Sequence, residues 1–309
     1  MAVIRSYRAG DEQGICRLFS TVFQLELPLA VWRWKYLRDG NPPPVFVAEE
    51  DGQIICHFGA IRQRLVWQDT EGWGFDSVDT MVHPHQQGRG LFRRTVQAFM
   101  RELCEGQSWF MYGFPTERHR RLGELLVGYE PIARVYRLHK ATSLLGPAHE
   151  NRETAFDMLP LDWDVQWQRL EPQFDLVNRR DRAFLVWRYW MRPGKRYRFV
   201  TVLGEPVLAV VGINKGKASL MEFLVEPENI VLARALLAGV EAILQDERVS
   251  DVEAWFPAFT WESRFLRDLG GFAAEEAEHW LECRLFDRRF SAVWLAEHFY
   301  YSLSDFDVY

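Results

Sequence analysis

The chain has 309 residues, of which 48% are hydrophobic and 26% charged, a balance typical of folded globular proteins. Its length predicts two domains of ordinary size. The formal net charge is −6 and no Lys/Arg stripe is interleaved with aromatic residues, apart from a short TERHRRLG segment, which argues against a nucleic-acid partner. No apolar run approaches the roughly 18 residues of a membrane-spanning helix, and no secretory signal is predicted at the N-terminus.

The first half of the chain predicts alternating helices and strands. The N-terminal MAVIRSYRAGDEQGICRLF is typical of a strand followed by a helix. A helix that ends at WRWKYL (32–37) leads into VFVAEEDGQIICHFGAI, which predicts two alternating strands joined by a tight turn. A strand ending at DTMVHP follows, and then a helix over LFRRTVQAFMREL. The segment GFPTERHRRLGELLVGY predicts the end of the next strand and a further helix.

Three features of this order recur later in the chain, in the same order. The first is WRWKYL with its two strands, which resembles WRYWM (187–191) followed by FVTVLGEPVLAVVGI. The second is DTMVHP, which resembles EFLVEP, with Pro84 opposite Pro227. The third is GFPTERHRRLGELLVGY, which resembles WFPAFTWESRFLRDLGGF. This repeat predicts two α/β halves with mixed strand directions.

The boundary between the halves is predicted between Lys140 and Leu161. There the segment ATSLLGPAHENRETAFDMLP has Gly, Pro and charge but little periodicity. We therefore expect one domain over residues 1–145 and a second over residues 160–309. Chance similarity between two ordinary α/β segments is the alternative.

The two halves differ after the matching prolines. Pro84 is followed by HQQGRGLFRR, whereas Pro227 is followed by ENIVLARALL, which has no glycine. The first N–H groups of a helix have no partner within it, and they attract an anion together with the helix dipole. Gly88 and Gly90 let a phosphate approach the backbone closely, and Arg89 can add charge.

Three interpretations of this glycine turn compete: a phosphate site, a tight turn alone, and an anion site whose chemistry is lost. The second half is predicted to build the same strand and helix without glycines. The fold therefore does not require them, and a ligand is the preferred explanation.

The segment VHPHQQGRGLFRR resembles the acyl-CoA-binding motif of the GCN5-related N-acetyltransferase (GNAT) superfamily, written Gln/Arg-x-x-Gly-x-Gly/Ala. Gln87, Gly90 and Phe92 fall on its three fixed positions, and Phe92 departs from the pattern. The following WFMYGFPTERHRRLGELLVGY resembles the next strand and helix of that family. With the repeat, the whole chain resembles a tandem acetyltransferase whose second domain is degenerate and lacks the Gly-rich loop.

This resemblance implies an α/β fold of tandem GNAT-like domains, each a mixed, mostly antiparallel sheet flanked by helices. It implies acetyl-CoA as cosubstrate, with its pantetheine arm between the strands of residues 78–82 and 110–114. A backbone N–H near Met81 or Val82 is the expected oxyanion donor. Thr116 stands where the family often has Asn, and it could serve as the N-cap of the next helix, with or without touching pantetheine. The pyrophosphate is expected on the amides of Gln87, Gly88, Arg89, Gly90, Leu91 and Phe92.

Acetyl transfer to an amine needs a base, because an alkylamine has a pKa of about 10.4 and is mostly protonated at pH 7. A partly buried carboxylate is the usual kind of base. Asp76 and Asp79 are expected on opposite faces of one strand, because side-chain direction alternates. Asp79 is preferred, since it lies five residues before Pro84, where resembling proteins often carry an acid. The alternative for either residue is a solvent-facing or edge-strand aspartate.

The leaving thiolate has a thiol pKa of about 8.5, so an acid is helpful but not obligatory. Many resembling proteins carry a Tyr for this step, and Glu124 occupies its position here. The four cysteines, Cys16, Cys56, Cys104 and Cys283, form no CxxC pair, which predicts free thiols in a reducing cytoplasm and no metal site.

The preferred hypothesis is a cytoplasmic N-acetyltransferase enzyme that moves an acetyl group from acetyl-CoA to a primary amine of a small molecule or protein. An amino sugar is one candidate acceptor, and a homodimer is left open; neither nucleic acid nor membrane is expected as a partner. The first alternative is a non-catalytic acyl-CoA-binding or regulatory protein. The second is a tRNA-dependent aminoacyl transferase, against which the negative charge and the intact glycine loop argue.

Overall fold

The computed structural model describes residues 1–38, 40–142 and 154–306, and contacts divide the chain into two compact units. The first unit comprises Met1–Leu65, Glu71–Ala133 and His279–Ala296. The second unit comprises Val66–Thr70, Arg134–Glu278 and Glu297–Tyr309. Each unit therefore combines segments that are far apart in the sequence.

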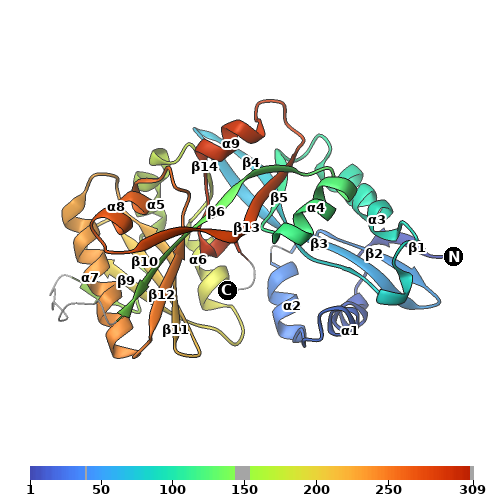
Figure 1. Ribbon diagram of the computed structural model, residues 1–309, viewed down its shortest axis with the longest axis horizontal. Helices are drawn as coiled ribbons and strands as arrows, with labels where there is room; N and C mark the ends of the chain where they lie inside the picture. The colour runs from blue at the N-terminus through green and yellow to red at the C-terminus, as the bar shows by residue number, and fades with distance from the viewer. Residues whose placement is uncertain (39, 143–153, 307–309) are drawn as a thin grey trace. The chain divides into compact units, whose positions relative to one another are not determined.

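The first unit is built mainly around one mixed sheet, with strand order β1-β2-β3-β4-β5-β13. Strands β1, β2 and β3 are antiparallel neighbours, and β4 is parallel to β5. Helices α1 and α2 lie on one side of these strands, and α3 and α4 on the other (Figure 1). The elements are β1 (Val3–Ser6), α1 (Asp11–Phe23), α2 (Leu29–Tyr36), β2 (Val45–Glu50), β3 (Gln53–Trp67), β4 (Thr70–Val82), α3 (Leu91–Phe99), β5 (Phe110–Gly113) and α4 (Glu117–Leu126).

The second unit repeats this order of elements. The series from β9 to β13 is a hairpin, a strand, a helix, a strand, a helix and a final strand, as is the series from β2 to β6. This confirms the predicted mixed α/β fold with helices flanking the sheet. The elements are β6 (Glu130–Ala141), β7 (Thr154–Phe156), α5 (Trp163–Leu170), β8 (Leu176–Asn178), α6 (Arg182–Leu185), β9 (Arg196–Val202), β10 (Leu208–Asn214), β11 (Lys217–Leu224), α7 (Ile230–Asp246), β12 (Asp251–Trp255), α8 (Trp261–Asp268), β13 (Ala273–Leu285), α9 (Ala292–His298) and β14 (Phe299–Tyr300).

The last strand of each repeat pairs with a strand of the other repeat. Strand β6 follows α4 in the chain but is antiparallel to β12. Strand β13 follows α8 but is antiparallel to β5. The chain therefore passes between the two units at more than one point. The predicted domains, residues 1–145 and 160–309, stay a prediction, because strand pairing does not show which segments fold independently.

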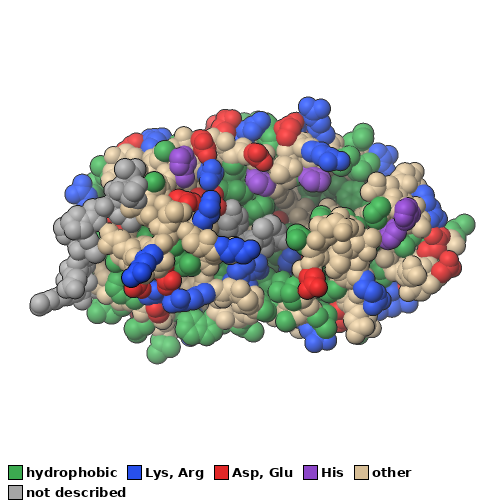
Figure 2. Space-filling model, turned by 60° about the horizontal axis from the view of Figure 1, so that its bottom comes forward, with side chains coloured by type: hydrophobic (Ala, Val, Ile, Leu, Met, Phe, Trp, Pro, Cys, Tyr) green, Lys and Arg blue, Asp and Glu red, His purple; other side chains and the backbone are tan. Residues whose placement is uncertain are grey.

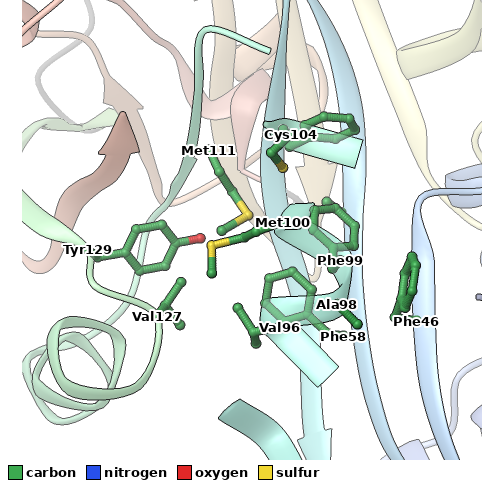
Figure 3. Packing of buried hydrophobic residues seen from close by; sticks show 12 residues of the cluster. Phe46, Phe58, Val96, Ala98, Phe99, Met100, Cys104, Met111, Val127 and Tyr129 are labelled. Atoms are coloured by element: carbon green, nitrogen blue, oxygen red, sulfur yellow. The ribbon is translucent and has the colours of Figure 1, made fainter. Parts of the chain in front are cut away.

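Helix α3 anchors the first unit by burying one face against the sheet, as its apolar spacing predicts. Phe99 lies against the rings of Phe46, Phe58 and Phe75, with ring centroids 6.0, 4.9 and 5.5 Å apart. Figure 3 shows Phe46, Phe58 and Phe99 with Met100 and Met111 in one apolar cluster, to which Phe75 also belongs. Because burying one Phe contributes roughly 1.5–3 kcal/mol, this contact fixes the C-terminal end of α3 relative to the strands.

The second unit encloses a fully buried ionic cluster. The Arg180 guanidinium lies 2.8 Å from Glu222 Oε1 and also pairs with Asp305. The Ser302 hydroxyl donates to Glu222 Oε2 at 3.1 Å. A buried carboxylate without its cation is costly, so these groups depend on one another.

None of the described helices is both long and apolar enough to cross a membrane. On the face in Figure 2, Lys and Arg side chains are interspersed with Asp and Glu side chains. The described residues on this face therefore form no basic stripe of the kind that nucleic-acid-binding proteins present.

Arg180→Met is expected to destabilise the protein by about 3–5 kcal/mol, because it leaves the carboxylates of Glu222 and Asp305 buried without their cation. Urea unfolding measures this change. The control is Arg196→Met, whose side chain is 66% exposed and 3.2 Å from Glu247, and which should change the midpoint little. Equal midpoints for the two variants would contradict the assigned role of the cluster.

Candidate functional site

Strands β4 and β5 begin as neighbours and then separate. Their parallel ladder covers three residue pairs and ends at Asp76 opposite Tyr112. At the next position the Ser77 hydroxyl donates to the Tyr112 carbonyl at 3.1 Å. The last part of β4 has therefore left β5, and an extended ligand can pair with its backbone.

A left-handed residue interrupts β4 just past this point. Asp79 has a φ of 52°, a conformation that is uncommon for residues other than glycine. Burial lowers the pKa of His57 to about 4, so its ring is uncharged at neutral pH. Its Nδ1 lies 2.7 Å from the Asp79 carbonyl and donates to it as the N–H tautomer, which holds the bulge.

The bulge changes the direction of side chains along β4. The expected placement of Asp76 and Asp79 on opposite faces assumed strict alternation. A left-handed residue breaks that alternation, so the parity argument fails across residue 79. Asp76 is buried at the last ladder position, where it is 3% exposed.

The Asp79 carboxylate is held by two residues at the end of α2. Lys35 Nζ lies 3.1 and 2.9 Å from its two oxygens, and the Tyr36 hydroxyl donates to Oδ2 at 2.8 Å. Burial alone would raise the pKa of Asp79, but the charge and hydrogen bonds of Lys35 bring it below its ordinary value. The carboxylate therefore stays ionised at neutral pH. Sequence reasoning did not identify Lys35, Tyr36 or His57.

The glycine loop leads directly into the start of α3. Gly88 and Gly90 have φ values of 77° and 67°, and a Cβ at either position would meet no atom within 4 Å. Gly90 is the N-cap of α3, and no side chain caps the helix. The first N–H groups of α3 therefore lack a side-chain cap among the described residues, and an anion can bind them.

The residues that flank these glycines fix the loop. Leu91 is 1% exposed, and the Phe92 ring lies 6.0 Å from that of Phe58, so both anchor the helix to the sheet. Arg89 donates to both carboxylate oxygens of Glu50, at 2.8 and 3.0 Å. Its charge is therefore directed to Glu50 and not to the loop amides.

The remaining predicted residues lie near the separated strands or on α4. Met81 and Val82 follow the bulge on β4. Thr116 occupies the N-cap of α4 as expected, but its hydroxyl pairs with His119 Nδ1 at 3.1 Å and does not cap the helix. Glu124 lies on α4, where its side chain is 37% exposed and pairs with Arg120. The described contacts therefore do not bring Glu124 to Asp79.

Glu282 is a buried acid beside β5 that sequence reasoning missed. It lies on β13 opposite Gly113, is 3% exposed, and has Oε2 buried without a hydrogen-bond partner among the described residues. Burial, reinforced by the charge of Glu124, raises its pKa to about 8. A Cβ at Gly123 would lie 2.5 Å from Glu282 Oε1. A glycine inside the helical RRLGELL was the available signal for this close approach.

No group of three His, Cys, Asp or Glu side chains in the described residues is arranged to hold a metal ion. All four cysteines are free thiols, and Cys56, Cys104 and Cys283 are buried.

Glu282→Gln is expected to remove a loss of stability at high pH. Because the folded-state pKa is raised from 4.5 to about 8, stability from this group is fully present below pH 4.5 and is lost as the pH rises through 8. The wild type should lose on the order of a few kcal/mol more than Glu282→Gln between pH 5 and 9. Urea unfolding across this range measures the difference. Glu278→Gln, at an exposed position of β13, should follow the wild type, and parallel profiles for all three proteins would refute the assignment.

The comparisons with known proteins agree with this geometry. Residues 3–123 match the acetyltransferase (GNAT) domain family. A comparison with curated protein sequences gives no match. Among solved structures, the chain is similar to a probable N-acyltransferase from Enterococcus faecalis V583, with a TM-score of 0.70, 11% identity, and coverage of 93% of this chain and 73% of that chain.

Two further structures are similar over most of the chain. A GCN5-related N-acetyltransferase from Kribbella flavida has a TM-score of 0.64 and 15% identity, covering 92% of this chain and 71% of that chain. The N-myristoyltransferase of Saccharomyces cerevisiae, solved with bound myristoyl-CoA, has a TM-score of 0.61 and 10% identity, covering 92% of this chain and 80% of that chain. At these identities the similarity establishes a shared fold. Residues 3–123 therefore match the acetyltransferase (GNAT) domain family, and the chain as a whole shares its fold with these structures.

Proposed function

We propose that this acyltransferase moves an acetyl group from acetyl-CoA to a primary amine, with the first unit as the catalytic one. The observation that carries the proposal is the uncapped start of α3 beside strands β4 and β5, which separate after Asp76. A helix start with exposed N–H groups suits a pyrophosphate, and a strand edge suits an amide-containing arm. A similar fold holds myristoyl-CoA in the yeast enzyme, which supports an acyl-CoA donor.

In this proposal the pyrophosphate lies on the amides of residues 87–92. Gly88 and Gly90 keep their left-handed conformation without strain and leave room for phosphate oxygens. The pantetheine arm then lies along β4 and carries the thioester toward the bulge at Asp79. We expect the reaction to take place in the cytoplasm, in keeping with the four free cysteines.

In the proposed reaction, the amine nitrogen attacks the thioester carbonyl carbon, a C–N bond forms, and the C–S bond breaks. The oxyanion of the intermediate accepts a backbone N–H near Met81 or Val82. We assign to Asp79 the acceptance of the proton that leaves nitrogen, with Lys35 and Tyr36 orienting its carboxylate. The thiolate leaves and takes up a proton, which is easy because its thiol has a pKa of about 8.5.

Gly90→Trp is expected to weaken the binding of desulfo-CoA at least tenfold, because the side chain blocks the start of α3 and strains a left-handed position. Isothermal titration calorimetry measures this binding. Gly106→Trp is the matched control, since Gly106 has a φ of 73° and equally open surroundings. Both variants should lose similar stability, on the order of 1–3 kcal/mol, and only Gly90→Trp should lose binding. Equal binding by the two variants would overturn the pyrophosphate site.

Asp79→Asn is expected to lower kcat by about 100-fold or more, because the amide retains the shape of the carboxylate but cannot accept a proton. Thiol release from acetyl-CoA measures this, with the best acceptor found in a panel of amino acids, polyamines and amino sugars. Binding of desulfo-CoA should stay within about twofold. Glu71→Gln, which changes a half-exposed carboxylate on the same strand, is the control. A kcat for Asp79→Asn equal to that of the control would remove Asp79 from the chemistry.

A further inference from the structure

Glu282 is a buried acid that the proposed reaction does not use, and it lies beside the point where β4 and β5 separate. Its strand, β13, belongs to the first unit from His279 on, and Glu282 stands opposite Gly113 of β5. Gly113 directly follows Tyr112, the last residue of β5 that pairs with β4. Residues directly opposite each other on antiparallel strands point to the same face of the sheet. The Glu282 side chain therefore lies on the face to which a side chain at position 113 would point.

The first residue of β4 beyond its ladder with β5, Ser77, reaches the same face. A Cβ at Gly113 would lie 2.9 Å from Ser77 Oγ, so the hydroxyl occupies the place that a side chain there would take. Ser77 is half-buried and accepts a hydrogen bond from the Tyr129 hydroxyl at 2.7 Å. Ser77 and Glu282 thus flank Gly113 at the base of the separated strands, two residues along β4 from Asp79.

The Glu282 carboxyl is enclosed by α4 and by the residues that follow this helix. A Cβ at Gly123 would lie 2.5 and 3.0 Å from its two oxygens and 2.9 Å from Tyr129 Cδ2, so the carboxyl and the tyrosine ring meet at this point. Oε2 is buried without a hydrogen-bond partner among the described residues. Burial raises the pKa of Glu282 to about 8, the charge of Glu124 adds to this effect, and that of Arg120 opposes it. At neutral pH the carboxyl therefore carries a proton that it can donate.

The second unit has no acid at the matching position. Gly113 and Trp255 each lie two residues before a proline, on the strand that precedes a helix. Opposite Trp255 in the ladder of β6 and β12 is Arg137, whose side chain is 37% exposed and pairs with Glu253. Trp255 itself is buried. The repeat therefore builds this strand pairing without a buried acid, so the fold alone does not account for Glu282.

We propose that Glu282 is the proton donor to the thiolate that leaves acetyl-CoA. The inference rests on the proposed acyl transfer, because that reaction produces the thiolate between β4 and β5. The amine nitrogen forms the C–N bond and its proton passes to Asp79, while the C–S bond breaks and the sulfur takes the proton of the Glu282 carboxyl. Both carboxyl groups then return to their starting states by exchanging protons with water. The acid thus comes from β13, and not from Glu124 of α4.

The acidity of Glu282 suits this step. Proton transfer is most effective when the donor and the acceptor have similar pKa values close to the working pH. The thiol of CoA has a pKa of about 8.5, and that of Glu282 is about 8. The Tyr129 hydroxyl lies on the same face, but burial and the charges of Glu282 and Asp76 raise its pKa well above 10, which makes it a poorer donor.

The test compares the wild type with Glu282→Gln as the pH is changed. Gln has the shape of the protonated acid, so the variant should fold and bind desulfo-CoA as the wild type does. Thiol release in a single turnover, with acetyl-CoA and the best acceptor of the amine panel, measures the chemical step. The ratio of the two rate constants cancels the ionisation of the amine. It should be about tenfold at about pH 6.5 and fall towards one above about pH 9, where the wild-type acid has lost its proton.

Two further variants separate the proton from the packing. Glu282→Asp retains the acid on a shorter side chain, and it should restore part of the rate with the same fall at high pH. Glu278→Gln removes an exposed carboxylate from the same strand and should match the wild type at every pH. A purely structural role would instead give a ratio that does not change with pH, or a loss of desulfo-CoA binding in Glu282→Gln.

The two proposals fail in different ways. If Glu282→Gln releases thiol as fast as the wild type, or if either result expected of a structural role is found, Glu282 is not the proton donor and acetyl transfer still stands. If the wild type neither bound desulfo-CoA nor released thiol with any amine, the proposed function itself would be wrong.

Discussion

The separation of β4 from β5 is the constraint on which the rest of the site depends. Two parallel strands that kept their ladder would satisfy each other and leave no backbone for a ligand. Here the ladder ends at Asp76, the Ser77 hydroxyl donates to the Tyr112 carbonyl, and a left-handed residue follows at Asp79. The bond from His57 to the Asp79 carbonyl holds that residue. Asp79 therefore shapes the strand through its backbone conformation, while its side-chain carboxylate pairs with Lys35.

The two units show how one architecture can serve different purposes. Both keep a tyrosine that donates to a buried acid on the strand before a helix. In the second unit, residues of the chain itself occupy this position, and Arg180 forms ion pairs there with Glu222 and Asp305. In the first unit the corresponding acid, Asp79, is held by Lys35 and Tyr36, and only this unit has glycines before its helix. We interpret the second unit as a scaffold.

Local signals in the sequence predicted much of the fold. The apolar spacing from Leu91 and the open left-handed positions of Gly88 and Gly90 depend on neighbouring residues, so the helix and the loop could be predicted. The exchange of β6 and β13 is non-local, and no spacing encodes it. The period-two pattern of the sequence does not distinguish a left-handed Asp79 from an ordinary strand residue. The sequence analysis therefore did not predict the change of side-chain direction at Asp79. Glu282 was missed for a related reason, because its burial depends on a strand contributed by the other repeat.

A crystal structure of the protein with desulfo-CoA tests the central claim most directly. The account predicts the pyrophosphate on the backbone N–H groups that begin α3, and the pantetheine arm along β4 where it has left β5. The arm should end near the bulge at Asp79. Desulfo-CoA bound away from α3, or with its arm outside the separated strands, would contradict the account.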